Sequence, residues 1–230
     1  MNPNKLLEQF LGGDLKGKLG QAGSFANQNL GGFAGGAAAG GVLALLLGNK
    51  KVRKMAGGVV GYGGAAALGA LALKAYQNWQ QGRPASSAPV ATQGDLQVAD
   101  QRFRPDAMPA AGGEPFPLVL VRAMIGAAKA DGHIDAEEHK QLFERVGQLG
   151  LDAEAKAYVF DALSKPVDLN TLAGAAQTEE QAAEIYLASR LAIDPDQPAE
   201  KSYLEALAHR LKLPAELVAH LDRQVEAAAS

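Results

Sequence analysis

The sequence predicts an all-α protein in two unlike parts: an N-terminal glycine-rich transmembrane helical hairpin and a C-terminal compact bundle of about seven helices. Three observations support this prediction. Of the 27 glycines, 20 lie before residue 95. Residues 1–81 carry eight Lys and Arg against two Asp and Glu, whereas residues 115–230 carry 11 against 19. After Pro117, apolar residues recur every three or four positions, the period of a helix that is buried on one side.

Residues 1–29 are predicted to be an amphipathic leader. Apolar side chains recur mostly at helical spacing, while Lys5, Glu8 and other charged residues lie off this stripe; the stripe consists of Leu6, Leu7, Phe10, Leu11, Leu15 and Leu19. We expect a short interfacial helix. A frayed polar leader is the alternative, because each glycine in a helix interior costs roughly 1 kcal/mol relative to alanine.

Residues 30–79 are predicted to form the membrane hairpin. Residues 30–47 and 55–73 are uncharged stretches of 18 and 19 residues. As helices they would be roughly 27–29 Å long, close to the thickness of bilayer hydrocarbon. The basic run 49–54 between them would lie at the lipid headgroups. Lys74, Tyr76 and Trp79 would anchor the end of the second helix at the interface.

Small residues at every fourth position give each predicted span a flat face. In lipid, such faces let helix backbones approach closely, so we expect the two ladders to pack on each other. The same faces would support a homo-oligomer. A soluble glycine-rich linker is the alternative. The ladder glycines are Gly32, Gly36 and Gly40 in the first stretch and Gly57, Gly61 and Gly69 in the second.

Residues 80–116 are predicted to be a linker, and residues 117–230 the helical domain. Six of the eleven prolines lie in the span from Gly82 to Pro117, which favours an irregular tether. Beyond it, helix caps and first-turn prolines divide the chain into short helices. Asp135, Asp152, Asp168 and Thr178 stand at N-cap positions. The predicted helices are 117–130, 136–149, 153–164, 169–175, 179–192, 198–211 and 214–228.

A weak internal repeat relates the two halves of this domain. At an offset of 62 residues Glu138 matches Glu200, and Leu142 matches Leu204. The repeat predicts two similar halves that face each other. Chance agreement among helices rich in alanine and leucine is the alternative.

Each half contains an acidic loop, 130–138 in the first and 192–200 in the second. If a pseudo-twofold axis relates the halves, the carboxylates of the two loops would converge on a site for calcium, magnesium or manganese, which prefer oxygen ligands. The first loop is not an EF-hand, because Ala136 stands where that loop needs glycine. Helix capping alone is the alternative. The candidate ligands are Asp131, Asp135, Glu138, Asp194, Asp196 and Glu200.

Several classes of chemistry lack their usual residues. No cysteine is present, which excludes disulfides, thiolate metal sites and cysteine nucleophiles. The sequence has neither a GxSxG elbow nor a P-loop, and His133 and His139 are too far apart to act as HExxH ligands. We therefore predict no catalytic residues. The acidic C-terminal part also argues against a nucleic-acid partner.

The motif AKADGHIDAEEHKQL, together with IDPDQPAEKSYL in the second loop, resembles the TerB-like domains named from tellurite-resistance proteins. The glycine-rich hairpin, linker and acidic domain taken together are similar to the uncharacterised YebE-like family of bacterial inner-membrane proteins. The resemblance covers residues 30–79 and 115–228. It implies an all-helical domain with an acidic metal site, located at the bacterial inner (cytoplasmic) membrane and involved in the envelope stress response.

The leading functional hypothesis is a membrane-anchored, non-enzymatic module. It would bind membrane lipid through its N-terminal part, and a divalent cation or a partner protein through its C-terminal domain. Two alternatives stay open: a metal-dependent hydrolase that uses the acidic residues, and a membrane scaffold assembled through the glycine ladders.

Overall fold

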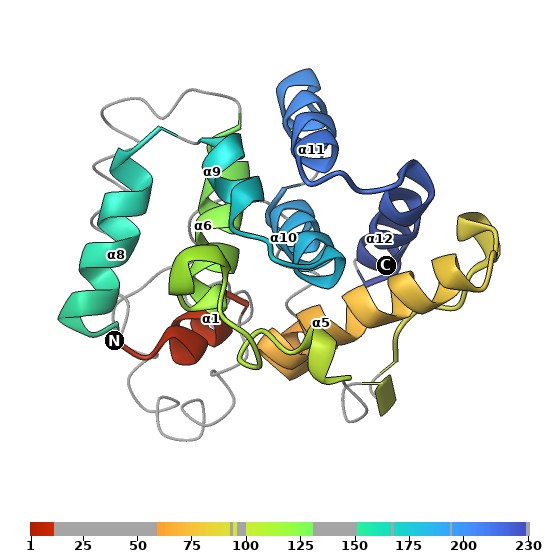
Figure 1. Cartoon of the computed structure of the whole chain (residues 1–230), viewed down its shortest axis with the longest axis horizontal. Coiled ribbons are helices and arrows are strands. Elements are labelled where there is room, and N and C mark those ends of the chain that lie inside the picture. The colour runs from red at the N-terminus through yellow and green to blue at the C-terminus, as the bar shows by residue number, and fades with distance from the viewer. Residues whose placement is uncertain are drawn as a thin grey trace, which may run out of the picture.

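The computed structural model describes residues 1–11, 59–92, 94–95, 100–130, 151–166, 168–193 and 195–228. Within these ranges the chain forms α-helices and short 3₁₀ turns and no strand, so the predicted all-α class is confirmed (Figure 1). The helices are α1 (Pro3–Leu11), α5 (Val59–Gln80), α6 (Phe116–Ala128), α8 (Ala153–Ser164), α9 (Leu169–Gly174), α10 (Glu179–Ala192), α11 (Pro198–Arg210) and α12 (Ala215–Ala228).

Six of the seven helices predicted for the C-terminal domain match these bounds closely, and the seventh, 136–149, lies outside the described residues. The side chains of Asp152, Asp168 and Thr178 each accept a backbone N–H in the first turn of the helix that follows. These three N-caps are therefore confirmed. Asp135 lies outside the described residues.

Helix α10 is the centre of the structure. Every residue from Gln181 to Ala192 is buried, and α10 contacts α5, α6, α11 and α12. Its most extensive contact is with α6, and both helices carry small buried side chains, among them Ala123 of α6 and Ser189 of α10. These two helices also correspond to each other in the predicted 62-residue repeat.

Helices α6 and α10 run in the same direction. Both begin beside one tight turn: Ala110 N–H donates to the Glu114 carbonyl just before α6, and Ala111 N–H donates to the Ala175 carbonyl just before α10, at 2.8 and 2.9 Å. Further along, the Ser189 hydroxyl of α10 donates to the Ala123 carbonyl of α6 at 3.3 Å. The two C-terminal ends therefore lie at the same end of the pair.

Helix α1 packs against protein. Its predicted apolar stripe is confirmed for Leu6, Leu7, Phe10 and Leu11, which are buried where α1 contacts α5 and α6 (Figure 1). Each such side chain contributes roughly 1.5–3 kcal/mol relative to exposure in water. The Met1 ammonium group also pairs with the Glu154 carboxylate at the start of α8.

Helix α5 is the described part of the predicted hairpin. It bends at Gly64, whose φ of 51° is a conformation that glycine adopts readily. Most side chains from Ala67 to Tyr76 are buried, and the helix contacts α1, α10 and α12. No helix among the described residues combines the length and the apolar character needed to cross a bilayer. Residues 30–58 lie outside the described residues.

The described parts of the predicted linker hold no regular α-helix but follow the surface of the helices closely. Residues 82–92, which we call the strap, are fixed to α5 and α12 by three buried polar side chains. The Pro89 carbonyl accepts from Asn78 and Gln224, the Ala91 N–H donates to Gln224 at 2.8 Å, and the Arg83 carbonyl is bound by His220. Further along, the Pro109 carbonyl accepts from Gln177 and Gln181 of the α10 segment.

Candidate functional site

Four of the six predicted metal ligands lie outside the described residues: Asp131, Asp135, Glu138 and Asp194. Of the other two, Asp196 is exposed and Glu200 is half-buried. A Glu200 carboxylate oxygen accepts the Gln197 N–H at 3.3 Å, which is a capping interaction at the start of α11. Among the described residues alone, no three His, Asp or Glu side chains are grouped closely enough to hold a metal ion.

The backbone nevertheless brings the starts of the two acidic loops to one end of the molecule. Because α6 and α10 are parallel, the chain leaves both helices toward the same end before it enters residues 131 and 194. A buried arginine holds the chain where it leaves α10. Arg190 donates to the Ile193 carbonyl at 3.0 Å and to the Asp222 carboxylate at 3.2 Å. Burial raises the pKa of Asp222, although Arg190 and Tyr186 act in the opposite direction.

Of the ladder glycines, as of the predicted metal ligands, only two lie among the described residues. Gly32, Gly36, Gly40 and Gly57 lie outside the described residues, whereas Gly61 and Gly69 belong to α5. Gly69 lies against the backbone of Phe103 and near the Glu184 carboxyl group of α10.

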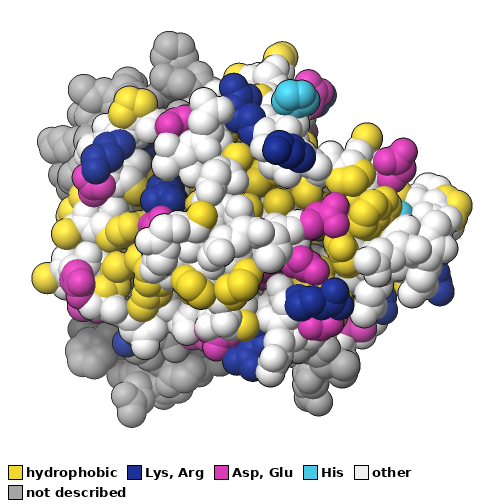
Figure 2. All heavy atoms as spheres, viewed as in Figure 1, with side chains coloured by type: hydrophobic (Ala, Val, Ile, Leu, Met, Phe, Trp, Pro, Cys, Tyr) yellow, Lys and Arg dark blue, Asp and Glu magenta, His cyan; other side chains and the backbone are white. Residues whose placement is uncertain are grey.

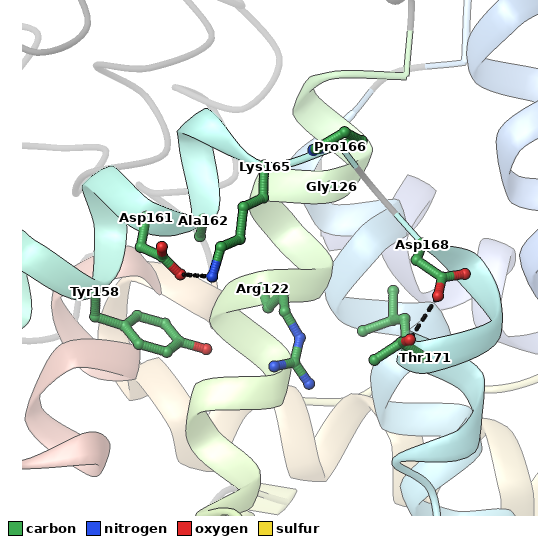
Figure 3. A pocket seen from close by; sticks show the side chains of 10 residues that line it. Arg122, Gly126, Tyr158, Asp161, Ala162, Lys165, Pro166, Asp168 and Thr171 are labelled. Carbon is green, nitrogen blue, oxygen red and sulfur yellow. Dashed lines mark hydrogen bonds and ion pairs between the residues drawn. The ribbon is translucent and has the colours of Figure 1, made fainter.

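Surface charge does not by itself identify a site. On the face shown in Figure 2, acidic and basic side chains are interspersed rather than gathered in one patch. The shape of the surface is the better guide, and it identifies a pocket of about 230 Å³ between α6, α8 and α9. The lining residues are Arg122, Gly126, Tyr158, Asp161, Ala162, Lys165, Pro166, Asp168, Thr171 and Leu172 (Figure 3).

Arg122 is the central polar group of this pocket. It is the one charged residue in α6, whose other residues are almost all buried. Its guanidinium group lies between Tyr158 of α8 and Thr171 of α9 (Figure 3). Glu114 accepts two hydrogen bonds from its terminal nitrogens, at 3.0 and 2.9 Å, and so fixes the orientation of the group.

The other polar groups of the pocket are held by local contacts. Tyr158 donates to the Leu118 carbonyl at 2.8 Å, and burial raises the pKa of its hydroxyl, which therefore stays neutral. Lys165 pairs with Asp161 at 2.7 Å. Asp168 caps α9, and its hydrogen bonds with Thr171 and Asn170 lower the pKa of its carboxyl group. These contacts give the pocket a defined arrangement of donors and acceptors.

Lys129 binds the C-terminal end of α8. Its ammonium group donates to the carbonyls of Leu163 and Lys165, both at 2.6 Å, and burial lowers its pKa. A cation at this position favours the C-terminal end of a helix.

One feature of the sequence points to this pocket. A single arginine inside the apolar run FPLVLVRAMIGAA must either reach solvent or find a partner. Its position therefore indicates a candidate functional residue. Tyr158 carries no comparable signal, because aromatic residues are common at buried helix positions.

Comparison with known proteins identifies the family. Residues 32–225 match a family described as "Protein of unknown function (DUF533)". The chain is also similar to a Yersinia enterocolitica relative, an uncharacterized protein in the ampR 5' region, with 38% identity over 95 residues, 41% of this chain and 68% of that relative. No solved structure matches the chain. Since the family match extends over most of its length, the chain belongs to the DUF533 family.

Proposed function

We propose that the chain is a non-enzymatic helical binding module that holds a divalent cation between its two acidic loops and is attached to the bacterial inner membrane by its glycine-rich N-terminal part. The resemblance to TerB-like and YebE-like proteins supports both halves of this proposal. It also supports a role in the envelope stress response, in which the cation-bound domain would contact a partner protein.

One observation carries the cation site: the parallel α6–α10 pair. Both acidic loops leave helix C-terminal ends on the same side, where the carbonyl dipoles favour positive charge. Carboxylates from the two loops would add hard oxygen ligands at that end, which suit calcium, magnesium or manganese.

Thermal unfolding and calorimetry of the full chain in detergent test the cation site. Calcium, magnesium or manganese should raise the melting temperature, because an ion that binds only the folded state stabilises it by mass action. Asp131→Asn combined with Asp194→Asn should abolish the rise. Asp106→Asn combined with Glu216→Gln removes the same charge from exposed positions elsewhere and should leave it intact. No heat and no thermal shift at millimolar ion would refute the site.

The membrane proposal is supported by the sequence of residues 30–47, which are uncharged and end in LALLL. A second span over residues 55–73 would require α5 to leave its contacts with α1, α10 and α12. We therefore assign the attachment to the residues before α5.

Carbonate extraction of membranes tests this assignment. The full chain should stay in the pellet, and Leu45→Lys combined with Leu46→Lys should release it, because charges in the hydrocarbon region are expensive. Gln21→Lys combined with Gln28→Lys adds the same charge before the apolar stretch and should not release it. Extraction of the unaltered chain by carbonate would contradict integral attachment.

A further inference from the structure

Arg122 has one edge of its guanidinium group occupied and another without a described partner. Glu114 binds the edge between the two terminal nitrogens. The remaining Nε–H is buried and has no hydrogen-bond partner among the described residues. Buried donors are nearly always paired in folded proteins, so this one indicates an acceptor that the described residues do not supply.

The acids that line the pocket are not available as that acceptor. Asp161 pairs with Lys165. Asp168 receives the Thr171 hydroxyl and the Asn170 N–H at the start of α9. Both carboxylates are thus held by their own segments, and in Figure 3 they flank the guanidinium of Arg122 on opposite sides without a bond to it. Among the described residues, none supplies an acceptor for this edge, and a ligand in the pocket would supply one.

The geometry of that edge selects the chemistry of the ligand. Nε–H and the neighbouring terminal N–H are parallel donors in one plane, and two oxygens of a carboxylate match them. The charges in and beside the pocket balance, with three cations (Arg122, Lys129 and Lys165) and three acids (Glu114, Asp161 and Asp168). A single negative charge is therefore better suited to the site than a doubly charged phosphate.

The walls of the pocket select the rest of the ligand. Gly126, Ala162, Leu172 and the ring of Tyr158 give an apolar lining beside Arg122, and the volume of about 230 Å³ limits the ligand to a small apolar group. We propose that this pocket binds a monocarboxylate with a small apolar body, with Arg122 recognising the carboxylate through its Nε edge. A free organic acid and the C-terminal residue of a peptide share this chemistry.

Nuclear magnetic resonance of the full chain in detergent tests the proposal directly, because the Arg122 Nε–H gives its own signal. Benzoate is the probe for a free acid, and a peptide ending in leucine is the probe for a chain terminus. The matched controls are benzamide and the same peptide with an amidated end. We expect the Arg122 signal to shift with one or both acids and with neither amide.

Variants link the shift to the pocket. Arg122→Lys keeps the charge but lacks the planar pair of donors, and it should weaken binding at least about tenfold. Arg104→Lys makes the same change at an exposed residue outside the pocket and should have no effect. Ala162→Leu should fill the pocket and block binding while Arg122 stays in place, which covers the case in which Arg122→Lys does not fold.

The possible outcomes distinguish a free acid from a peptide terminus as the ligand, and both of these from a pocket that binds neither. Binding of benzoate identifies a small-acid site, and binding of the free peptide alone identifies capture of a chain terminus. Equal binding of acids and amides, no shift of the Arg122 signal at about 10 mM probe (roughly ten times a millimolar Kd), or full binding by Ala162→Leu would overturn the proposal. The cation site does not enter this test, because the pocket residues belong to α6, α8 and α9.

Discussion

Gly69 of α5 lies directly against the main chain of Phe103: a Cβ atom added at Gly69 would stand 2.0 Å from the Phe103 carbonyl oxygen. Phe103 itself is fully buried, and its ring packs on Tyr76 with 5.5 Å between the ring centroids. The absence of a side chain at residue 69 therefore allows α5 to lie against the 3₁₀ turn Gln101–Phe103 and on α10.

Gly69→Ala should destabilise the protein by about 1–3 kcal/mol, because the new methyl group meets a backbone oxygen that cannot rotate away. Gly174→Ala is the matched control, since a Cβ there meets nothing within 4 Å. Urea unfolding followed by circular dichroism measures both. Equal stability of Gly69→Ala and the unaltered chain would show that α5 does not pack on Phe103 as described.

The strap gives a second prediction. Gln224 is fully buried and binds both the Ala91 N–H and the Pro89 carbonyl. Gln224→Leu keeps the volume but leaves the buried Ala91 N–H without a partner, while the Pro89 carbonyl keeps its hydrogen bond from Asn78. The loss should cost about 1–3 kcal/mol. Hydrogen exchange at the Ala91 amide should accelerate. Gln77→Leu, at an exposed position of α5, should change neither quantity; unchanged exchange in Gln224→Leu would mean that the strap is held by other contacts.

Helix α8 allows a cap to be compared with a surface ion pair on the same element. Asp152 accepts the Ala155 N–H at 2.8 Å, whereas Asp161 pairs with Lys165 at the exposed C-terminal end. Asp152→Ala should cost about 0.5–2 kcal/mol. Asp161→Ala should cost only about 0.3–0.5 kcal/mol. Denaturant titrations of the two variants measure the difference, and a larger loss for Asp161→Ala would reverse this assignment.

The helices of the C-terminal domain could be predicted because each carries its own signals. An apolar period defines the length, and Asp152, Asp168 or Thr178 begins the helix with a side-chain cap. These are local interactions, so one stretch of sequence contains all the information. The direction of α6 relative to α10 depends on contacts such as Ser189 with Ala123, 66 residues apart, and periodicity does not encode them.

The environment of α5 could not be predicted for a different reason. A stretch rich in alanine, glycine and leucine is equally suited to lipid and to the interior of an all-helical protein, because both are apolar. The choice depends on long-range partners such as Phe103 and helix α12. Likewise, the proline content indicated an irregular segment at 80–116, but the side chains that bind its carbonyls lie on distant helices. Of the candidate pocket, only the isolated charge of Arg122 was visible in the sequence.

Glu184 provides the last prediction. It lies on α10, is 1% exposed, and its Oε1 atom has no hydrogen-bond partner among the described residues. Burial, with a further contribution from the Glu180 charge, raises the pKa of its carboxyl group well above the usual value. The folded protein therefore holds this proton more tightly than the unfolded chain does.

The sign of the pH dependence follows from this difference in proton binding. Above the unfolded pKa of about 4.3, the unfolded chain releases the proton while the folded chain keeps it, so stability falls as pH rises, by at most about 1.4 kcal/mol per pH unit for one group. Glu184→Gln has nearly the same shape and no proton to lose. It should match the unaltered chain at pH 4 and become progressively more stable than it toward pH 8.

Melting temperatures across this range check the prediction. Because the difference between the two proteins is measured, the titration of Asp222 and other groups cancels. Parallel curves would mean that Glu184 ionises in the folded state as readily as in the unfolded chain.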